Sequence, residues 1–191
     1  MWDRNCWIES MKELARRILD QYALNPYGSH GLLHWVRVHE SGIGIASSSG
    51  ADRDVVAYFA LLHDSRRLNE SRDPQHGPRG AEFARLLHEE GLVDLNPTQL
   101  RDLITAIAHH NSHDRVEDMD GNSITIGTCW DADRLDLPRV GTTVNPGYLY
   151  TREAKRLANL WNHEDAYFIT DDRKKLLKTW GVTLPEKNQP F

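Results

Sequence analysis

The sequence predicts an all-α protein of about six to eight helices. Three observations support this fold class. Apolar residues recur every three or four positions in several stretches, which is the spacing of an amphipathic helix. Turns rich in Gly, Pro and Asn separate these stretches. No stretch alternates clearly between apolar and polar residues, as a half-buried strand would.

The length and organisation of the chain indicate one domain. At 191 residues, the chain is long enough to bury a core without disulfides or metals as staples. We find no internal repeat, low-complexity segment or interdomain linker. We therefore expect a single domain over residues 1–191, with core motifs in 29–141, C-terminal helices in 142–184 and a tail in 185–191.

The first part of the chain predicts three amphipathic helices. Residues 7–24 place apolar side chains every three or four positions, and Asn-Pro-Tyr-Gly at 25–28 ends that helix. Ser29 is expected to cap the second helix, whose buried stripe covers 33–46. Asp52 is expected to cap the third helix.

The middle of the chain predicts a long polar loop and two helices. Residues 68–80 are polar and rich in turn formers, so we expect them to form the rim of an active site. A helix is expected over 79–90, with Gly91 ending it. Asn-Pro-Thr at 96–98 opens another helix, whose apolar stripe, continued by three positions, reaches His110.

The last third of the chain predicts three more helices. Residues 124–135 are expected to be helical, although β-branched residues occupy the start of this stretch. Thr151 is expected to cap a helix that runs to about Trp161. A short helix that carries Leu177 and Trp180 completes the fold.

Composition and charge argue against several classes of function. The net charge is -5 and the basic residues are scattered, so we expect no extended nucleic-acid surface. No stretch approaches the ~20 apolar residues of a membrane span, so we expect no membrane partner. Cys6 and Cys129 form no CxxC pair, which argues against a zinc ribbon and a disulfide framework. A cytoplasmic location is the simplest interpretation of this cysteine usage.

A histidine and an aspartate stand side by side directly after an apolar helical run. The run covers residues 55–62, and His63 and Asp64 follow it. The helix is expected to enter the core, so it carries two polar groups into apolar surroundings. Buried charge needs a partner, and a divalent cation suits both an imidazole and a carboxylate.

Two other segments offer matching metal ligands. His34 lies in His-Trp-Val-Arg-Val, and Asp131 opens Asp-Ala-Asp-Arg-Leu-Asp. Together with His63 and Asp64 they supply two imidazoles and two carboxylates, whose charge neutralises a divalent ion. Such a shell suits one divalent transition metal, Mn, Fe, Co or Ni, with Mg or Zn as alternatives.

The acidic segment and His34 each have an alternative interpretation. Asp131 and Asp133 are two residues apart and cannot share one helix face, so we expect only one, Asp131, to face the metal. Asp133 or Asp136 would then pair with Arg134 or another base. His34 would otherwise be a core histidine with satisfied hydrogen bonds.

The order of these motifs resembles a known family. The succession His, His-Asp, Asp over residues 29–141 resembles the HD superfamily of metal-dependent phosphohydrolases. His-Gly-Leu-Leu-His-Trp at 30–35 and Asp-Pro-Gln-His-Gly at 73–77 resemble a branch of small bacterial single-domain HD proteins. The resemblance implies a compact helical domain and metal ligands at His34, His63, Asp64 and Asp131. It also implies that a metal-activated water hydrolyses a phosphoester or phosphoanhydride bond, most simply in a small nucleotide.

Further histidines leave a second metal ion open. Some HD enzymes hold two ions by adding histidines between the His-Asp pair and the last Asp, an interval that here contains His76, His109 and His110. His110 continues an apolar stripe and is therefore the better candidate of the adjacent pair. His76 falls in the predicted loop, where it would bind either metal or phosphate. One metal and a histidine-lined substrate pocket are our default expectation.

Four residues are candidates for catalysis or substrate binding. His30 lies one helical turn before His34, so it can reach the same side of the helix. Arg66, Arg67 and Arg79 follow the His-Asp pair or begin the next helix, and each offers a guanidinium to phosphate oxygens. We expect at least one of these arginines to be solvated.

Two other functions fit the same residues. The first is a non-catalytic regulatory module that binds a metal or nucleotide without turnover. The second is oxygen-dependent cleavage at a mixed-valence di-iron centre, which requires the extra histidines to be ligands. One metal ion per chain would exclude the second.

Overall fold

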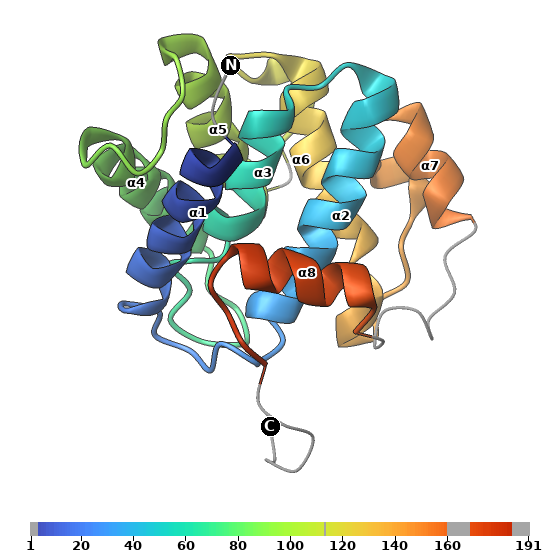
Figure 1. The fold of residues 1–191 in the computed structure, drawn as a ribbon. Helices are drawn as coiled ribbons and strands as arrows, with labels where there is room; N and C mark the ends of the chain where they lie inside the picture. The colour runs from blue at the N-terminus through green and yellow to red at the C-terminus, as the bar shows by residue number, and fades with distance from the viewer. Residues whose placement is uncertain (1–3, 113, 160–168, 185–191) are drawn as a thin grey trace.

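Eight α-helices and three short 3₁₀ turns occur in the part of the chain that the structure describes, residues 4–112, 114–159 and 169–184 (Figure 1). The structure is a computed structural model. The α-helices are α1 (Arg4–Leu19), α2 (Leu32–Ser49), α3 (Arg53–Leu62), α4 (His76–Glu89), α5 (Pro97–His109), α6 (Ser123–Leu135), α7 (Arg152–Ala158) and α8 (Asp171–Thr179). The 3₁₀ turns are η1 (Val116–Asp118), η2 (Leu137–Val140) and η3 (Pro146–Tyr148). No strand occurs in these residues, and the predicted all-α class is confirmed.

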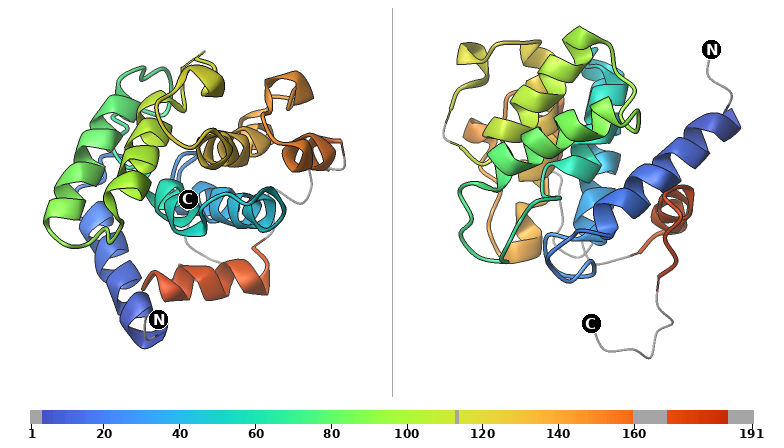
Figure 2. Two further views of the ribbon diagram at one scale, coloured as in Figure 1. Left: turned by 90° about the horizontal axis from the view of Figure 1, so that it is seen from above. Right: turned by 90° about the vertical axis from the view of Figure 1, so that its left-hand side faces the viewer.

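Helix α3 lies at the centre of the assembly and packs against α2, α5 and α6 (Figure 2). Every residue from Val55 to Leu62 is buried, because neighbouring helices cover all sides of α3. Gly42 lets α2 pack closely against α3 and α6, since an added Cβ would lie 2.5 Å from the side chain of Val56 and 3.3 Å from that of Ala132. Helix α3 therefore ends inside the molecule, and the residues that directly follow it lie in the interior.

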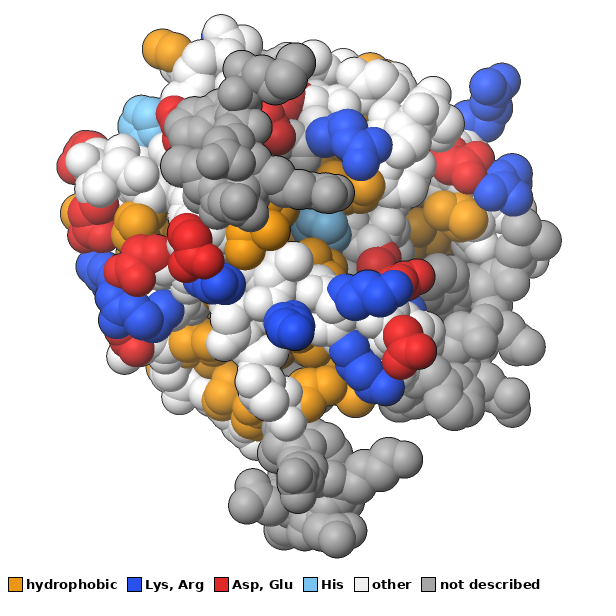
Figure 3. Space-filling view, in the orientation of Figure 1, with side chains coloured by type: hydrophobic (Ala, Val, Ile, Leu, Met, Phe, Trp, Pro, Cys, Tyr) orange, Lys and Arg blue, Asp and Glu red, His pale blue; other side chains and the backbone are white. Residues whose placement is uncertain are grey.

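The remaining helices surround this centre. Helix α4 packs on α5, α7 packs on α2 and α6, and α8 packs on α1 and α2 (Figure 1). Leu177 and Trp180 are buried in the main core, as expected for the last helix. On the face seen in Figure 3, Lys and Arg side chains are interspersed with Asp and Glu. Within the described ranges, no helix has the length and apolar character needed to span a bilayer.

The predicted helix caps at Asp52 and Thr151 are confirmed, and Asn96 is a further cap at the predicted start of α5. The side chains of Asp52, Asn96 and Thr151 accept hydrogen bonds from first-turn backbone N–H groups of α3, α5 and α7. Asn96 forms a full capping box with Gln99. The predicted helix over 124–135 is also confirmed as α6. The expected end of α7 near Trp161 lies outside the described residues.

The connection between α1 and α2 differs from expectation. Helix α1 ends at Leu19 rather than near residue 24, because the N–H of Tyr22 closes a tight turn on the carbonyl of Leu19 at 3.2 Å. The Tyr22 hydroxyl then donates to the carbonyl of His30 at 2.8 Å and draws this segment toward α2. The cap expected from Ser29 is wrong, because Gly31 is the N-cap residue of α2 and makes no side-chain cap bond.

Candidate metal centre

Helix α3 carries His63 and Asp64 into the interior. His63 is the C-cap residue of α3, and the chain turns immediately afterwards, with the N–H of Ser65 bonded to the carbonyl of Leu62 at 3.1 Å. His63 is 0% exposed and Asp64 is 2% exposed. The Phe59 ring stacks on the His63 imidazole with centroids 5.0 Å apart. These polar groups are therefore cut off from solvent and depend on partners inside the protein.

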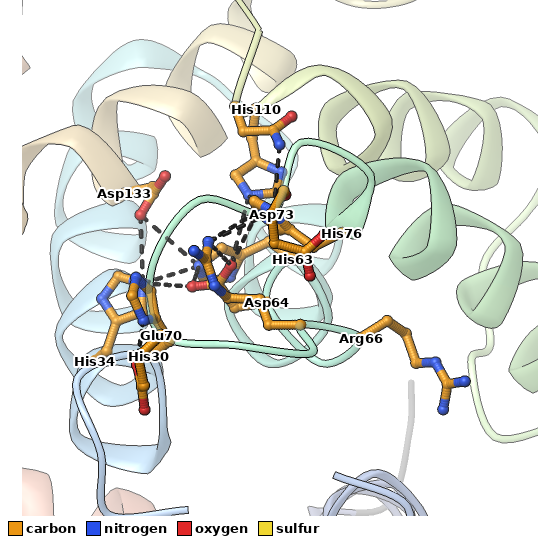
Figure 4. A network of polar contacts seen from close by, with 12 residues as sticks. His30, His34, His63, Asp64, Arg66, Glu70, Asp73, His76, His110 and Asp133 are labelled. Carbon is orange, nitrogen blue, oxygen red and sulfur yellow. Dashed lines mark hydrogen bonds and ion pairs between the residues drawn. The ribbon is translucent and has the colours of Figure 1, made fainter. Parts of the chain in front are cut away.

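His34 of α2, His63 and Asp133 of α6 form the first cluster (Figure 4). The Nε2 atoms of His34 and His63 are 2.9 Å apart, and Oδ1 of Asp133 lies 3.3 Å from the former and 3.7 Å from the latter. Oδ2 of Asp64 completes the group at 3.5 and 3.6 Å from the same two nitrogens. Atoms that share one ion at about 2.1 Å lie about 3.0–3.4 Å from each other. The four side chains thus have approximately the spacing of a metal shell.

Oδ1 of Asp64 faces a second cluster, formed with His76 and His110. Nε2 of His76 lies 3.1 Å from this oxygen and Nε2 of His110 lies 3.7 Å from it, while the two nitrogens are 2.8 Å apart. His110 is the C-cap residue of α5, where the apolar stripe leads. His76 is the first residue of α4 rather than part of a loop, because that helix begins three residues earlier than predicted. Asp64 therefore belongs to both clusters, with one oxygen in each.

The histidines around these clusters are all oriented through Nδ1. The acceptors are the carbonyl oxygens of Phe59 for His63, Asp73 for His76 and Ile107 for His110, and the carboxylates of Asp136 for His34 and Glu70 for His30. Because these oxygens only accept, Nδ1 donates and the neutral imidazole presents a lone pair at Nε2. Facing lone pairs at 2.8 and 2.9 Å require a proton or a cation between them. This donor chemistry fits a metal ion.

The carboxylates determine how the buried imidazoles are protonated. Burial is the largest influence on His63 and lowers its pKa to about 3. Burial also acts to lower the pKa of His34, but hydrogen bonds to Asp133, Asp136 and Asp64 outweigh it and raise that pKa to about 9. Burial opposes ionisation of Asp64 and Asp133, yet the surrounding imidazoles hold both carboxyl pKa values below their usual range. Without a metal, the first cluster thus combines ionised carboxylates with a protonated His34 at neutral pH, and a divalent transition metal would bind in place of that proton.

Asp131 lies outside both clusters, and Asp133 takes the place expected for it. Oδ2 of Asp131 accepts hydrogen bonds of 2.7 Å from both the backbone N–H and the hydroxyl of Thr151, and Oδ1 accepts one of 2.7 Å from the N–H of Tyr150. Residues two apart on a helix point about 200° away from each other. A side chain at 131 that binds the start of α7 therefore leaves position 133 to face His34. The structure corrects the expected orientation of these two aspartates.

Asp136 is a site residue to which the sequence interpretation assigned no role at the metal. Its Oδ2 accepts from Nδ1 of His34 at 2.7 Å, and its Oδ1 accepts from Nε of Arg37 at 2.6 Å. A carboxylate behind a ligating histidine orients the ring and makes Nε2 more basic. The signal was present in the sequence, because Arg37 lies one turn after His34 and Asp136 lies one turn after Asp133.

Arg67 is the arginine that reaches the clusters. Its guanidinium is buried, with Nη1 3.4 Å from Oδ1 of Asp64 and 3.3 Å from Nε2 of His76. Nη2 donates to the carbonyl of Ser71 at 2.7 Å, which fixes the side chain. A permanent positive charge therefore lies at the second cluster.

Three other candidate residues are not brought into the clusters. Their partners are the Phe83 ring for Arg66, the Asp73 carboxylate for Arg79 and the Asp114 carboxylate for His109. Figure 4 shows the Arg66 side chain extending away from the imidazoles. The side chain of His109 is 42% exposed, so of the adjacent histidines only His110 is buried.

His30 lies at the edge of the first cluster. It is 8% exposed, and its ring centroid is 6.3 Å from that of His34. Its Nδ1 contacts the carboxylate of Glu70, which lies in the polar segment predicted to form the rim of the site. The loop after Asp64 thus contributes a carboxylate that orients a histidine beside the candidate metal ligands.

Comparison with known proteins supports the same family at the level of structure. No protein-family model matches the sequence, and no curated protein matches it. The fold matches the crystal structure of a predicted HD superfamily hydrolase from an uncultured Thermotogales bacterium, with a TM-score of 0.58. The two sequences are 27% identical, and the match covers 91% of this chain and 92% of the other. The expected resemblance to the HD superfamily is confirmed.

Proposed function

We propose that this protein, whose fold is that of the HD superfamily, is a metal-dependent phosphohydrolase that acts on a small nucleotide. The observation that carries the proposal is the convergence of four buried imidazole Nε2 atoms on the carboxylates of Asp64 and Asp133, beside the guanidinium of Arg67. A hydrolase fold and a polar site able to hold a cation agree with this class of reaction. We also propose a cytoplasmic location, which suits the free thiol of Cys129.

In this proposal, His34, His63, Asp64 and Asp133 hold one divalent transition metal. Bound there, the cation would lower the pKa of a coordinated water and polarise a phosphoryl oxygen. Asp136 holds the imidazole of His34 so that Nε2 faces the cluster. The metal remains one of Mn, Fe, Co or Ni, with Mg or Zn as alternatives, since mixed nitrogen and oxygen shells accept each of them.

The second cluster is proposed to bind the phosphoryl group rather than a second ion. Arg67 already places a cation 3.4 Å from Oδ1 of Asp64. A second metal there would lie beside this guanidinium and be repelled by it. Arg67 can instead donate to phosphate oxygens and stabilise the charge that develops on them, and His76 and His110 can donate through Nε2 when they carry a proton there.

His30 is proposed to exchange a proton during the reaction. Its Nδ1 donates to Glu70, so Nε2 can accept a proton from the attacking water and return it to the leaving oxygen. Burial, the largest influence, lowers the pKa of His30 below its usual value. A neutral imidazole is therefore the resting form at pH 7, as a general base requires.

The experiment that tests this function combines metal analysis with a substrate screen. Metal-loaded protein is incubated with a panel of nucleotides and generic phosphate esters, and released phosphate is measured. Asp64→Ala should lose both bound metal and turnover, whereas Asp54→Ala, which changes an exposed aspartate at the start of α3, should retain both. Turnover that persists after metal removal contradicts the mechanism.

The same experiment separates the two alternative functions. Tight nucleotide binding without any product, across the whole panel, would favour a regulatory module. Two iron ions per chain with oxygen consumption would favour a di-iron oxygenase. We expect one ion per chain and release of phosphate.

A further inference from the structure

A groove of about 910 Å³ opens beside His110, at the C-terminal ends of α5 and α6. Its lining includes His110, Arg115, Trp130, Arg134, Tyr148 and Lys155. This volume is far larger than one phosphate group needs and lies in the range of sites for small organic ligands. Since His110 belongs to the second cluster, the groove begins at the candidate catalytic centre.

The packing of α5 against α6 places Arg134 at that opening. The N–H of Asn122, just before α6, donates to Asp102 at 3.0 Å, and the indole of Trp130 donates to the carbonyl of Ala106 at 2.9 Å. Both contacts fix α5 against α6. One turn further along each helix come His110 and Arg134, which line the same groove.

Arg134 is held rigidly in the groove by uncharged partners. Its guanidinium lies 5.4 Å from the centroid of the Trp130 ring, and Nη1 donates to the carbonyl of Tyr148 at 3.0 Å. Among the described residues, no carboxylate lies within 4.0 Å of the guanidinium of Arg134 or the ammonium of Lys155. Arg134 does not pair with Asp133 or Asp136, and the base that pairs with Asp136 is Arg37.

The acidic residues of the groove do not balance these charges. Asp114 contacts Nδ1 of His109 at 2.8 Å, and Glu117 lies 3.8 Å from Arg115. Arg134 and Lys155 are thus two cations without an ion pair inside 4.0 Å among the described residues, in a protein of net charge -5; the acidic residue that Arg134 influences at longer range, Asp131, is bound to Tyr150 and Thr151. Such a pair, fixed beside a phosphate-binding cluster, suits an anion.

We propose that Arg134, assisted by Lys155, binds a second anionic group of the substrate, separate from the phosphoryl group that is cleaved. The substrate class is then an organic phosphate that carries a further phosphate or carboxylate, such as a nucleotide with more than one phosphate. This inference rests on the proposed function, because the first anionic group is the one bound at Arg67, His76 and His110.

Binding of non-hydrolysable phosphonates tests the inference without turnover. The probes are methylphosphonate and a series of alkane diphosphonates with one to four methylene groups between the phosphonates, titrated calorimetrically into manganese-loaded protein. At least one diphosphonate should bind wild type about tenfold more tightly than methylphosphonate, a difference of about 1.4 kcal/mol. Arg134→Met should remove most of this gain, Arg134→Lys should retain part of it, and Lys155→Met should weaken it by about threefold. The preferred length of the probe then reports the separation of the two anion sites.

A matched control removes a charge from the same region. Arg152→Met changes an exposed arginine of α7, the helix of Lys155, outside the lining of this groove, and should leave the gain intact. Chelation of manganese by the probes is equal for all variants at equal concentrations. If wild type shows no gain, or if both Arg134→Met and Lys155→Met keep it, the inference is wrong. A gain that depends on Arg134 together with no hydrolysis of any nucleotide would contradict the proposed function alone.

Discussion

The two buried clusters share Asp64 but differ in what surrounds them. In the first cluster, Asp133 and Asp64 contact the imidazoles directly, and Asp136 holds His34 from behind. In the second cluster, Asp64 supplies the carboxylate oxygen and Arg67 supplies a permanent cation. The two pairs of histidines are similar, with Nε2 atoms 2.9 and 2.8 Å apart, but the first pair is surrounded by negative carboxylates and the second lies beside a positive guanidinium. The neighbouring charges, rather than the histidines, indicate which cluster suits a metal and which suits a phosphate.

The largest expected effect comes from removing the charge of Asp133. Asp133→Asn should lower metal affinity by at least about a hundredfold and kcat/KM by about a thousandfold, because a ligand of the first cluster becomes neutral. Asp131→Asn should keep the metal, since Asp131 contacts Tyr150 and Thr151 instead. It should cost about 1–3 kcal/mol of stability, because an amide replaces an acceptor of three hydrogen bonds. Metal content, phosphate release and urea denaturation of both variants measure this contrast. Metal loss in Asp131→Asn but not in Asp133→Asn would show that Asp131, rather than Asp133, binds the metal.

The second prediction concerns the cation of the second cluster. Arg67→Met should lower kcat/KM by about a hundredfold, because a guanidinium that stabilises phosphate charge is lost. The same change should raise the metal content from one toward two ions per chain, since Asp64, His76 and His110 become free to hold a cation. Arg66→Met, which changes the neighbouring arginine that packs on Phe83, is the control and should change neither value. Two ions per chain in wild type would show that Arg67 does not exclude the second metal.

The smallest expected effect concerns a half-buried histidine outside both clusters. In the described part of the chain, His39 forms no hydrogen bond, and its ring centroid lies 5.9 Å from that of Trp180. Desolvation by the surrounding protein is the main cause that lowers the pKa of His39 to about 4. The unfolded chain binds a proton near pH 6.5 while the folded chain does not until about pH 4. Stability therefore falls as the pH drops through this window, by up to about 3 kcal/mol.

His39→Gln removes this group and serves to isolate its contribution. The free energy of unfolding of wild type and of His39→Gln should be measured by urea denaturation at pH 7.5, 6, 5 and 4. Wild type should lose more stability than the variant over this range, because glutamine does not titrate. Parallel losses in the two proteins would show that His39 is not responsible.

Much of the fold follows from local sequence patterns, namely the periodicity of apolar residues and the residues that cap helices. The all-α class, the caps at Asp52 and Thr151, the start of a helix at 96–98 and the α6 helix over Ser123–Leu135 depend on nearby residues, so periodicity and capping rules predicted them. The convergence of His34, His63 and Asp64 was also expected from the motifs. The early end of α1, where the N–H of Tyr22 turns back on the carbonyl of Leu19, and the start of α2 at Gly31 rather than Ser29 were missed.

The sequence by itself determined that a helical protein would bring histidines and aspartates into its core, since apolar runs carry them there. Only the tertiary structure decided which of them meet. The sequence alone does not distinguish Asp131 from Asp133. They take different roles because Tyr150 and Thr151, at the start of α7, donate hydrogen bonds to Asp131. Arg66 and Arg67 are likewise adjacent, yet one packs on Phe83 and the other reaches Asp64. The contacts of Asp131 with Tyr150 and Thr151 and of Arg66 with Phe83 join residues distant in the chain, and local spacing does not encode them.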